Sequence, residues 1–324
     1  MGADDDRMKS MKFEHPEHIP VGIHFLPATW MKYRDALDAL VRRHPVIFGE
    51  QPREQRDYDA IADPKYARGR HVDAWGCVWE NIVPGAASMV KGHPVPTREA
   101  VRTLKPPAED MGLPHGFMYL RVCDLRGFEE MMIDFAEEPP ELQQLIDVVL
   151  AYNVRQVARL LAERAGRAPE ILTFGDDLGM QTSLPMSPAT WRTYLKPCFA
   201  RLYGMVREAG HYVYMHSDGH FWEVIPDLVE CGVNVINPQF RANGLEALAR
   251  VCRGKVCVDL DLDRQMLPFC APADIDAHVR ESIEALALPE GGLWLKGECG
   301  PDVPLANIEA LCEALERHRG HFRN

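Results

Sequence analysis

The chain has 324 residues and a formal net charge of -12 at pH 7, with 46% hydrophobic and 26% charged residues. This composition supplies enough apolar side chain for a sizeable core, so it excludes a disordered chain. The negative charge opposes binding to nucleic acid, and the sequence contains no run of about 18 apolar residues that would predict a membrane-spanning helix. We therefore expect neither a nucleic acid nor a membrane as a partner.

The 9 cysteines are scattered along the chain and never form a Cys-x-x-Cys pair. That pattern favours reduced thiols over a disulfide framework. The first 20 residues begin Met1-Gly2-Ala3-Asp4 and contain no apolar segment typical of a signal peptide. Together these observations predict a cytoplasmic protein.

Short apolar, β-rich segments alternate with longer segments of helical periodicity. We expect a first strand at residues 20–26 and a helix at 30–41. Further strands are expected at residues 117–122, 171–174, 212–215, 233–236, 256–260 and 293–295. Amphipathic helices lie between them, such as the one at 221–229, whose apolar residues recur at i, i+3, i+4, i+7 and i+8.

Connections of this length imply parallel strands, because hairpins need only short turns. The alternation predicts an α/β protein with a single (β/α)8 TIM barrel over residues 1–324, and we place its eighth strand within 75–118. An open doubly wound sheet is the alternative, but no Gly-x-Gly-x-x-Gly follows the first strand. Ser187-Pro188 predicts a helix start, while Gly210, Gly232 and Gly320 predict helix ends.

Residues 27–116 contain a loop-rich stretch dense in proline, glycine, tryptophan and histidine. A loop of this length is usually functional, so we expect an N-terminal excursion that covers the barrel mouth as a lid. Trp75 and Trp79, with Trp30, are candidates for lining a substrate pocket. The alternative is an excursion that only packs, with its tryptophans buried in ordinary contacts.

Polar side chains follow the expected strands at the end where parallel barrels carry their chemistry. These residues are Asp176 and Asp177, then His216, Ser217 and Asp218, then Asn237 and Gln239, then Asp259, Asp261 and Asp263, and finally Lys296, Glu298 and Cys299. Any single one has an alternative explanation as a turn or capping residue. Acid, imidazole and thiol groups at several strand ends together predict an active site.

His216-x-Asp218 places an imidazole and a carboxylate on one turn, and both groups bind zinc. A third ligand from another strand end, Glu298 or Cys299, would leave the fourth position open for a substrate, as in catalytic zinc sites. The alternative is a histidine that only makes hydrogen bonds, because no Cys-x-x-Cys or His-Glu-x-x-His pattern is present.

Three passages resemble the uroporphyrinogen decarboxylase superfamily, whose fold is a (β/α)8 barrel. The passages are Phe174-Gly175-Asp176-Asp177-Leu178-Gly179 with Met186-Ser187-Pro188 and Tyr194-Leu195-Lys196-Pro197 behind it, His216-Ser217-Asp218-Gly219, and Gly300-Pro301-Asp302-Val303-Pro304 with Asn307-Ile308. The resemblance covers most of residues 117–320. It implies one of two chemistries: decarboxylation of a tetrapyrrole, or zinc-dependent methyl transfer between a corrinoid protein and another group.

The decarboxylases carry a basic motif similar to Arg-Gln-Ala-Gly-Arg-Tyr near the N-terminus, and paired arginines suit a substrate with many carboxylates. The corresponding place here reads Phe25-Leu26-Pro27-Ala28-Thr29-Trp30, with no arginine. The decarboxylases also have a histidine in their last motif, where this chain has Glu298 and Cys299. The resemblance is therefore nearer to the methyltransferase branch.

The zinc methyltransferases carry a His-x-Cys turn and a later cysteine. By this resemblance His216 is the first ligand, Asp218 stands in place of the second, and Glu298 or Cys299 is the third. More oxygen ligands make zinc a harder Lewis acid, which suits an ether or hydroxyl oxygen better than a thiolate.

The resemblance, together with the exchanged ligands, thus implies a methyltransferase that passes a methyl group from a small methylated substrate, such as a methyl ether, to a corrinoid protein. Asp176, Asp177 and His216 would be catalytic, and Asn237 and Gln239 would position the substrate. The alternatives are a decarboxylase-like carboxy-lyase and a barrel that binds a ligand without turnover. A homo-oligomer is compatible with either chemistry.

Overall fold

The computed structural model describes residues 3–52, 56–61, 63–108 and 111–321. By its internal contacts the chain divides into two compact units. Unit 1 comprises Met1–Gly69, Asn81–Ser88 and Gln239–Asn324, and unit 2 comprises Arg70–Glu80 and Met89–Pro238. One domain over 1–324 stays a prediction, as does a lid formed by 27–116, of which residues 53–55, 62 and 109–110 lie outside the described residues.

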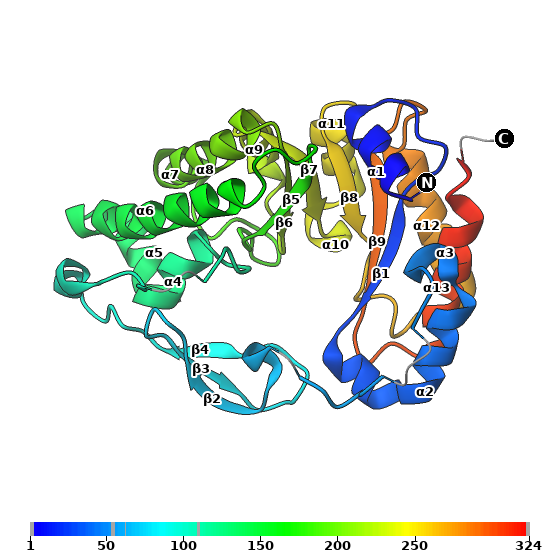
Figure 1. The fold of residues 1–324 in the computed structure, drawn as a ribbon, viewed down its shortest axis with the longest axis horizontal. Coiled ribbons are helices and arrows are strands. Elements are labelled where there is room, and N and C mark those ends of the chain that lie inside the picture. The colour runs from blue at the N-terminus through cyan, green and yellow to red at the C-terminus, as the bar shows by residue number, and fades with distance from the viewer. Residues whose placement is uncertain (1–2, 53–55, 62, 109–110, 322–324) are drawn as a thin grey trace. The chain divides into compact units, whose positions relative to one another are not determined.

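Unit 1 contains three parallel strands in the order β1-β9-β8. They are β1 (Val21–Phe25), β9 (Leu293–Cys299) and β8 (Cys257–Asp261). The helices are α1 (Ala3–Lys12), α2 (Pro27–Arg43), α3 (Pro45–Phe48), η1 (Pro64–Tyr66), α10 (Phe240–Asn243), α11 (Leu245–Cys252), α12 (Pro272–Leu286) and α13 (Leu305–His318). Figure 1 shows α12 and α13 side by side in orange and red. The α12 stripe of Ile275, Val279, Ile283 and Leu286 is buried, which fixes the face that this helix turns inward.

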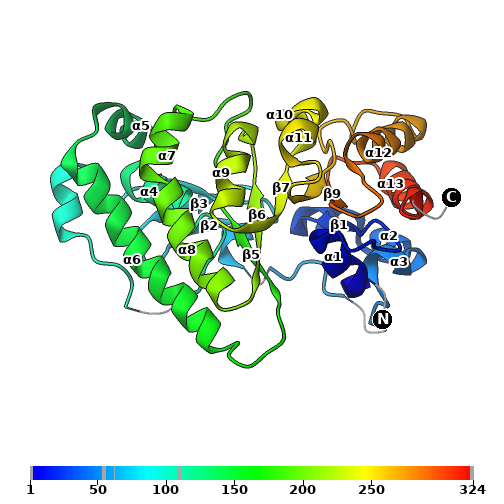
Figure 2. The same cartoon turned by 90° about the horizontal axis from the view of Figure 1, so that it is seen from above.

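Unit 2 also contains three parallel strands, in the order β7-β6-β5. They are β5 (Ile171–Gly175), β6 (Tyr212–Ser217) and β7 (Val233–Pro238). The helices are η2 (Arg98–Thr103), α4 (Tyr119–Arg126), α5 (Phe128–Glu137), α6 (Pro140–Ala162), α7 (Pro188–Tyr194), α8 (Lys196–Glu208), η3 (Trp222–Val224) and α9 (Ile225–Glu230). Helices α6, α7 and α8 lie next to one another in both views (Figures 1 and 2). The aromatic rings of Phe174, Phe199 and Tyr203 pack together and join α8 to β5.

A small sheet with the order β2-β3-β4 occupies part of the expected excursion. Its strands are β2 (Gly69–Val72), β3 (Val78–Asn81) and β4 (Met89–Gly92), and β3 and β4 are antiparallel. Asp73, in the turn between β2 and β3, accepts hydrogen bonds from Arg121 Nη1 at 2.6 Å and from Trp79 Nε1 at 3.0 Å. Trp75 packs edge-on against Tyr152, with ring centroids 5.0 Å apart. This turn is therefore fixed to α4 and α6.

Two of the expected strands are wrong. Residues 117–122 lead into helix α4 rather than forming a strand. The amide groups of Met118, Tyr119 and Leu120 donate to the carboxylate of Asp176 at 3.1, 2.5 and 2.9 Å, which fixes this segment as a helix N-terminus. In the described part of 75–118, the strands β3 and β4 belong to the separate small sheet, so no eighth parallel strand is present there.

The other six expected strands are confirmed as β1 and β5 to β9, and the expected helix at 30–41 lies within α2. Ser187 Oγ accepts from Thr190 N at 3.0 Å and caps α7, as predicted. Gly210 and Gly232 follow α8 and α9 with φ values of +82° and +111°, which favour glycine. The α/β class with parallel strands and crossover helices, as in TIM barrels, is therefore confirmed. Within the described residues, no helix combines the length and apolarity needed to span a membrane.

Candidate metal centre

The carboxyl ends of β5, β6 and β7 are aligned in unit 2. Gly175 pairs with His216, and His216 pairs with Asn237. An irregularity between Val213 and Tyr214 shifts the register of β6 and β7 and sets this alignment. Side chains at or just after these positions therefore meet at the same edge of the three strands.

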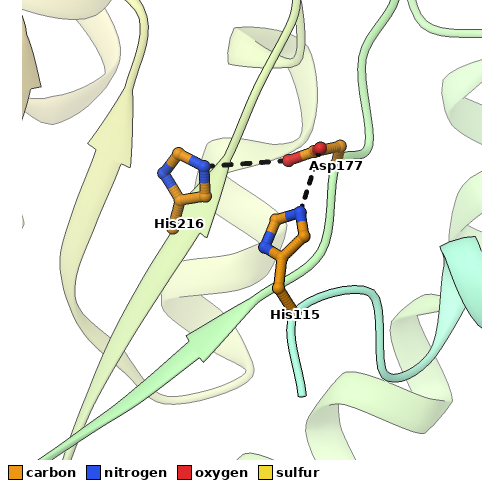
Figure 3. A group of neighbouring side chains, drawn as sticks. All are labelled: His115, Asp177 and His216. Atoms are coloured by element: carbon orange, nitrogen blue, oxygen red, sulfur yellow. Dashed lines mark hydrogen bonds and ion pairs between the residues drawn. The ribbon is translucent and has the colours of Figure 1, made fainter. Parts of the chain in front are cut away.

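Three of these side chains form a compact group: His115, Asp177 and His216 (Figure 3). His115 Nε2 lies 3.0 Å from Asp177 Oδ2, and His216 Nε2 lies 3.8 Å from Asp177 Oδ1. Both imidazole rings point toward the carboxylate in Figure 3, and one ligand atom from each residue lies within 4.8 Å of the other two. The side chains are partly exposed, at 34%, 28% and 21%, so solvent and small molecules reach them.

These separations suit a zinc ion. Ligand atoms about 2.1 Å from a tetrahedral zinc lie about 3.4 Å from one another, and the distances of 3.0 and 3.8 Å bracket that value. Two imidazoles and one carboxylate form the His₂-carboxylate set of many catalytic zinc sites, which keep a fourth position open. The donor set therefore fits zinc.

Asn237 orients the His216 ring through a hydrogen bond at Nδ1. Its Oδ1 lies 2.6 Å from His216 Nδ1, and Asn237 is fully buried. With the amide oxygen accepting, Nδ1 carries the proton and Nε2 presents its lone pair toward Asp177. A metal-binding histidine is usually held in this way by a hydrogen bond from its other ring nitrogen. Asn237, expected to position a substrate, is thus placed against His216.

Asp177 is held as an anion. Burial raises the pKa of its carboxyl group, but the hydrogen bond from His115, the amide N–H of Asp218 at 2.8 Å and the nearby His216 ring outweigh burial and lower the pKa below its ordinary value. An ionised carboxylate between two imidazoles is the state that binds a cation. Asp218 lies beside the group, with its Oδ1 3.4 Å from His216 Nε2, and remains a candidate oxygen ligand.

Glycines allow close contact between the loop after β5, which carries Asp177, and the loop after β6, which carries Asp218. The amide of Gly179 donates to the carbonyl of Asp218 at 3.3 Å. A Cβ atom on Gly219, whose φ is +82°, would lie 2.3 Å from the carbonyl carbon of Gly179. A Cβ atom on Gly175 would lie 2.5 Å from His115 Nδ1, so this glycine makes room for the ring. The loop after β5 and the loop after β6 are therefore packed tightly against each other.

Asp176 is not a member of this group. It is fully buried, and its carboxylate accepts the three amide groups at the start of α4. Burial raises the pKa of Asp176 to about 6, while the α4 amides act in the opposite direction. These contacts are those of a helix cap, and a catalytic role for Asp176 stays a prediction.

The remaining expected site residues have partners of their own. Glu298 and Cys299 belong to unit 1, where Glu298 forms an ion pair with Arg264 at 2.5 Å. Burial raises the pKa of the Cys299 thiol, which opposes the thiolate form that binds metals. The backbone of Gln239 forms an isolated parallel β-bridge with Asp261. The backbone carbonyl of Gln239 accepts a hydrogen bond from Asn243 Nδ2 in α10 at 2.9 Å. A metal site that joins His216 to Glu298 or Cys299 stays a prediction.

The sequence reasoning missed His115. It comes from the loop before α4, and only Gly116 beside it, with a φ of +78°, marks a sharp turn there. The amide of Gly116 donates to the carbonyl of Gly175 at 2.7 Å and fastens the loop to the end of β5. A histidine followed by glycine just before an apolar run was the available signal.

The fold and the site together define an α/β enzyme of the TIM-barrel class with a candidate metal centre at its strand ends. Residues 118–318, more than half of the chain, match the family described as uroporphyrinogen decarboxylase (URO-D). The protein belongs to the uroporphyrinogen decarboxylase family.

Solved structures add a further comparison. A methyltransferase from Methanosarcina mazei matches with a TM-score of 0.65 and 16% identity, over 98% of this chain and 99% of that chain. A B12-independent methionine synthase from Shewanella sp. W3-18-1 matches with a TM-score of 0.42 and 12% identity, over 79% of this chain and 74% of that chain. No curated protein matches the sequence significantly. At 16% identity, the likeness to the methyltransferase establishes a shared fold.

Proposed function

We propose that this protein is a metal-dependent methyltransferase that moves a methyl group from a small methylated substrate to a corrinoid protein. The observation that carries the proposal is the group of His115, Asp177 and His216 at aligned strand ends. Family membership supports an enzyme, and the likeness to a methyltransferase over nearly the whole chain favours this branch of the family.

The proposed ligands of a zinc ion are His115 Nε2, a carboxylate oxygen of Asp177 and His216 Nε2. A zinc ion bound there supplies Lewis acidity at an open coordination position. With imidazole and carboxylate donors and no thiolate, the site suits an oxygen of the substrate, which favours a methyl ether over a methylated thiol. Asn237 holds His216 in the orientation that binding requires, and Asp177 stays ionised between the two rings.

Metal content tests the centre. Elemental analysis of the purified protein is expected to find about one zinc per chain, lost in His115→Ala and His216→Ala. His71→Ala is the matched control in unit 2, because His71 stacks on Trp79 and lies outside the group. Metal-free protein with full activity, or alanine variants that keep their metal, would contradict the proposal.

Activity tests the reaction. Free cob(I)alamin is mixed with the protein and a panel of methyl ethers, methylamines and methyl thioethers, and loss of the cob(I)alamin absorbance reports methylation. We expect transfer from a methyl ether that disappears in His216→Ala. A parallel incubation with uroporphyrinogen, followed by chromatography for lost carboxyl groups, identifies the decarboxylase alternative if it gives product.

A further inference from the structure

A second site lies in unit 1, in a cavity of about 660 Å³ lined by α10, by the end of β9 and by the segments that follow β1, β8 and β9. Two arginines, Arg241 and Arg264, line it together with an apolar set of Leu26, Pro268, Phe269 and Pro301. Phe269 is 88% exposed at this cavity, which is unusual for so large an apolar side chain. The cavity thus offers both cationic and apolar surface to a small ligand.

The cavity lies where barrels of this class often bind anions. Strand β9 is the last strand of the chain and pairs with β1, the first, and β8 precedes it. The loops after the last two strands of a TIM barrel frequently bind a phosphate group. Gln265 and Phe269 come from the first of these loops, and Gly300 and Asp302 from the second.

Arg241 is held in place by a carboxylate behind it. Asp263, only 6% exposed and not part of the cavity lining, accepts from Arg241 Nε at 2.9 Å and from Nη2 at 2.5 Å. Asp263 is fixed in turn, because its Oδ1 accepts from the Gln265 amide at 3.0 Å and its own amide donates to His278 Nε2 at 3.0 Å. Burial lowers the pKa of His278, which favours the neutral ring that can accept this bond.

Asp263 therefore engages one edge of the guanidinium and leaves the Nη1/Nη2 edge for another planar anion. Although held in this way, the Arg241 side chain is 55% exposed. A cation fixed before binding loses less entropy when an anion arrives, and a guanidinium matches carboxylate and phosphate geometry.

Arg264 supplies the second cation. Its Nη1 donates to Glu298 Oε1 at 2.5 Å, which fixes the position of the guanidinium group. The other carboxylate of the lining, Asp302, is exposed to solvent. Each arginine keeps one carboxylate partner, and both guanidinium groups line the cavity.

We infer that this cavity binds a small molecule that carries a carboxylate or phosphate group on a compact apolar body. Arg241 and Arg264 bind the anionic group, and Leu26, Pro268, Phe269 and Pro301 contact the apolar part. The inference goes beyond the proposed methyl transfer, because it concerns the residues that line this cavity, and His115, Asp177 and His216 are not among them.

Isothermal titration of the purified full chain tests the inference with three probes: 4-methylbenzoate, phenyl phosphate and the neutral 4-methylbenzamide. We expect at least one anion to bind, and to bind about 10-fold or more tightly than the amide, because hydrogen bonds to charged groups are the stronger ones. The tighter of the two anions identifies the class of ligand. Arg241→Gln and Arg264→Gln should each weaken that binding by about 10- to 100-fold.

Arg317→Gln is the matched control in the same unit, since Arg317 pairs with Asp276 on α12 and lies outside the cavity lining. It should leave the affinity unchanged. Circular dichroism verifies that each variant is folded, and Arg264→Gln and the amide comparison decide the question if Arg241→Gln fails to fold. The inference is overturned if neither anion binds at millimolar concentration, if the amide binds as tightly, or if folded glutamine variants bind like the wild type.

Discussion

Replacing Asn237 by leucine tests whether the strand register builds the metal centre. The substitution keeps the size of the side chain but removes the oxygen that lies 2.6 Å from His216 Nδ1. The His216 ring would lose the partner that fixes its tautomer and orientation. Loss of such a partner typically reduces metal affinity by about 10- to 100-fold, equivalent to about 1.4 to 2.7 kcal/mol.

The affinity is measured on metal-free protein at pH 7 by zinc titration against a chromophoric chelator. Asn237 is fully buried, so leucine also leaves a ring nitrogen without its partner, and we expect the free energy of unfolding to fall by about 1 to 3 kcal/mol. Asn237→Asp retains an acceptor and should bind zinc at least as tightly as the wild type.

Asn307→Leu is the control, on helix α13, which carries none of the candidate metal ligands. The Asn307 side chain is buried and its Nδ2 donates to the carbonyl of Leu267 at 2.7 Å, so leucine removes a comparable buried hydrogen bond. We expect lower stability but unchanged zinc affinity. If folded Asn237→Leu protein binds zinc within about twofold of the wild type, the assigned orientation of His216 is wrong, because the hydrogen-bond partner of a metal-binding histidine should change the affinity by about tenfold or more.

Three further predictions concern the surroundings of the site. Asp176→Asn should lower the free energy of unfolding by about 1 to 3 kcal/mol in urea, because one amide oxygen cannot replace two carboxylate oxygens at the start of α4, and an unchanged urea midpoint would contradict the capping role. Burial raises the pKa of Asp227, but hydrogen bonds from Arg192 and Lys196 lower it below its ordinary value, so the stability it contributes is full above that value and is lost as the pH falls through the lowered pKa. The stability difference between wild type and Asp227→Asn should therefore shrink between pH 5 and pH 2, and a constant difference would refute this. Gly219→Ala should reduce both stability and zinc content, since its Cβ would lie 2.3 Å from the backbone of the facing loop, and a folded variant with full zinc would show that the loops can separate.

The sequence predicted the parallel strands well because each is a short apolar run followed by a helix with its own periodicity. The segments at 171–174 and 212–215 read as strands from composition alone, and both are strands. Residues 117–122 have the same composition but lead into α4, because Asp176 caps that helix from a distant part of the chain. Local propensity cannot separate a short buried helix from a short buried strand.

For the site, the sequence identified residue types and strand ends, and the tertiary structure decided which of them meet. Asp177 and His216 follow separate strands, and their approach depends on the register of β5, β6 and β7. Asn237 was recognised as a polar strand end, but its contact with His216 follows from a register shift that leaves no trace in composition.

His115 shows most clearly what the sequence alone could not decide. A histidine in a loop has many uses, and the glycine and apolar run that follow His115 indicate a turn without specifying a metal ligand. It becomes a candidate ligand because Gly175 leaves space for its ring and the Gly116 amide fastens its loop to β5. The order of residues determined the parallel strands β1 and β5 to β9, the helices between them and the family, whereas packing between distant segments decided which side chains share a site.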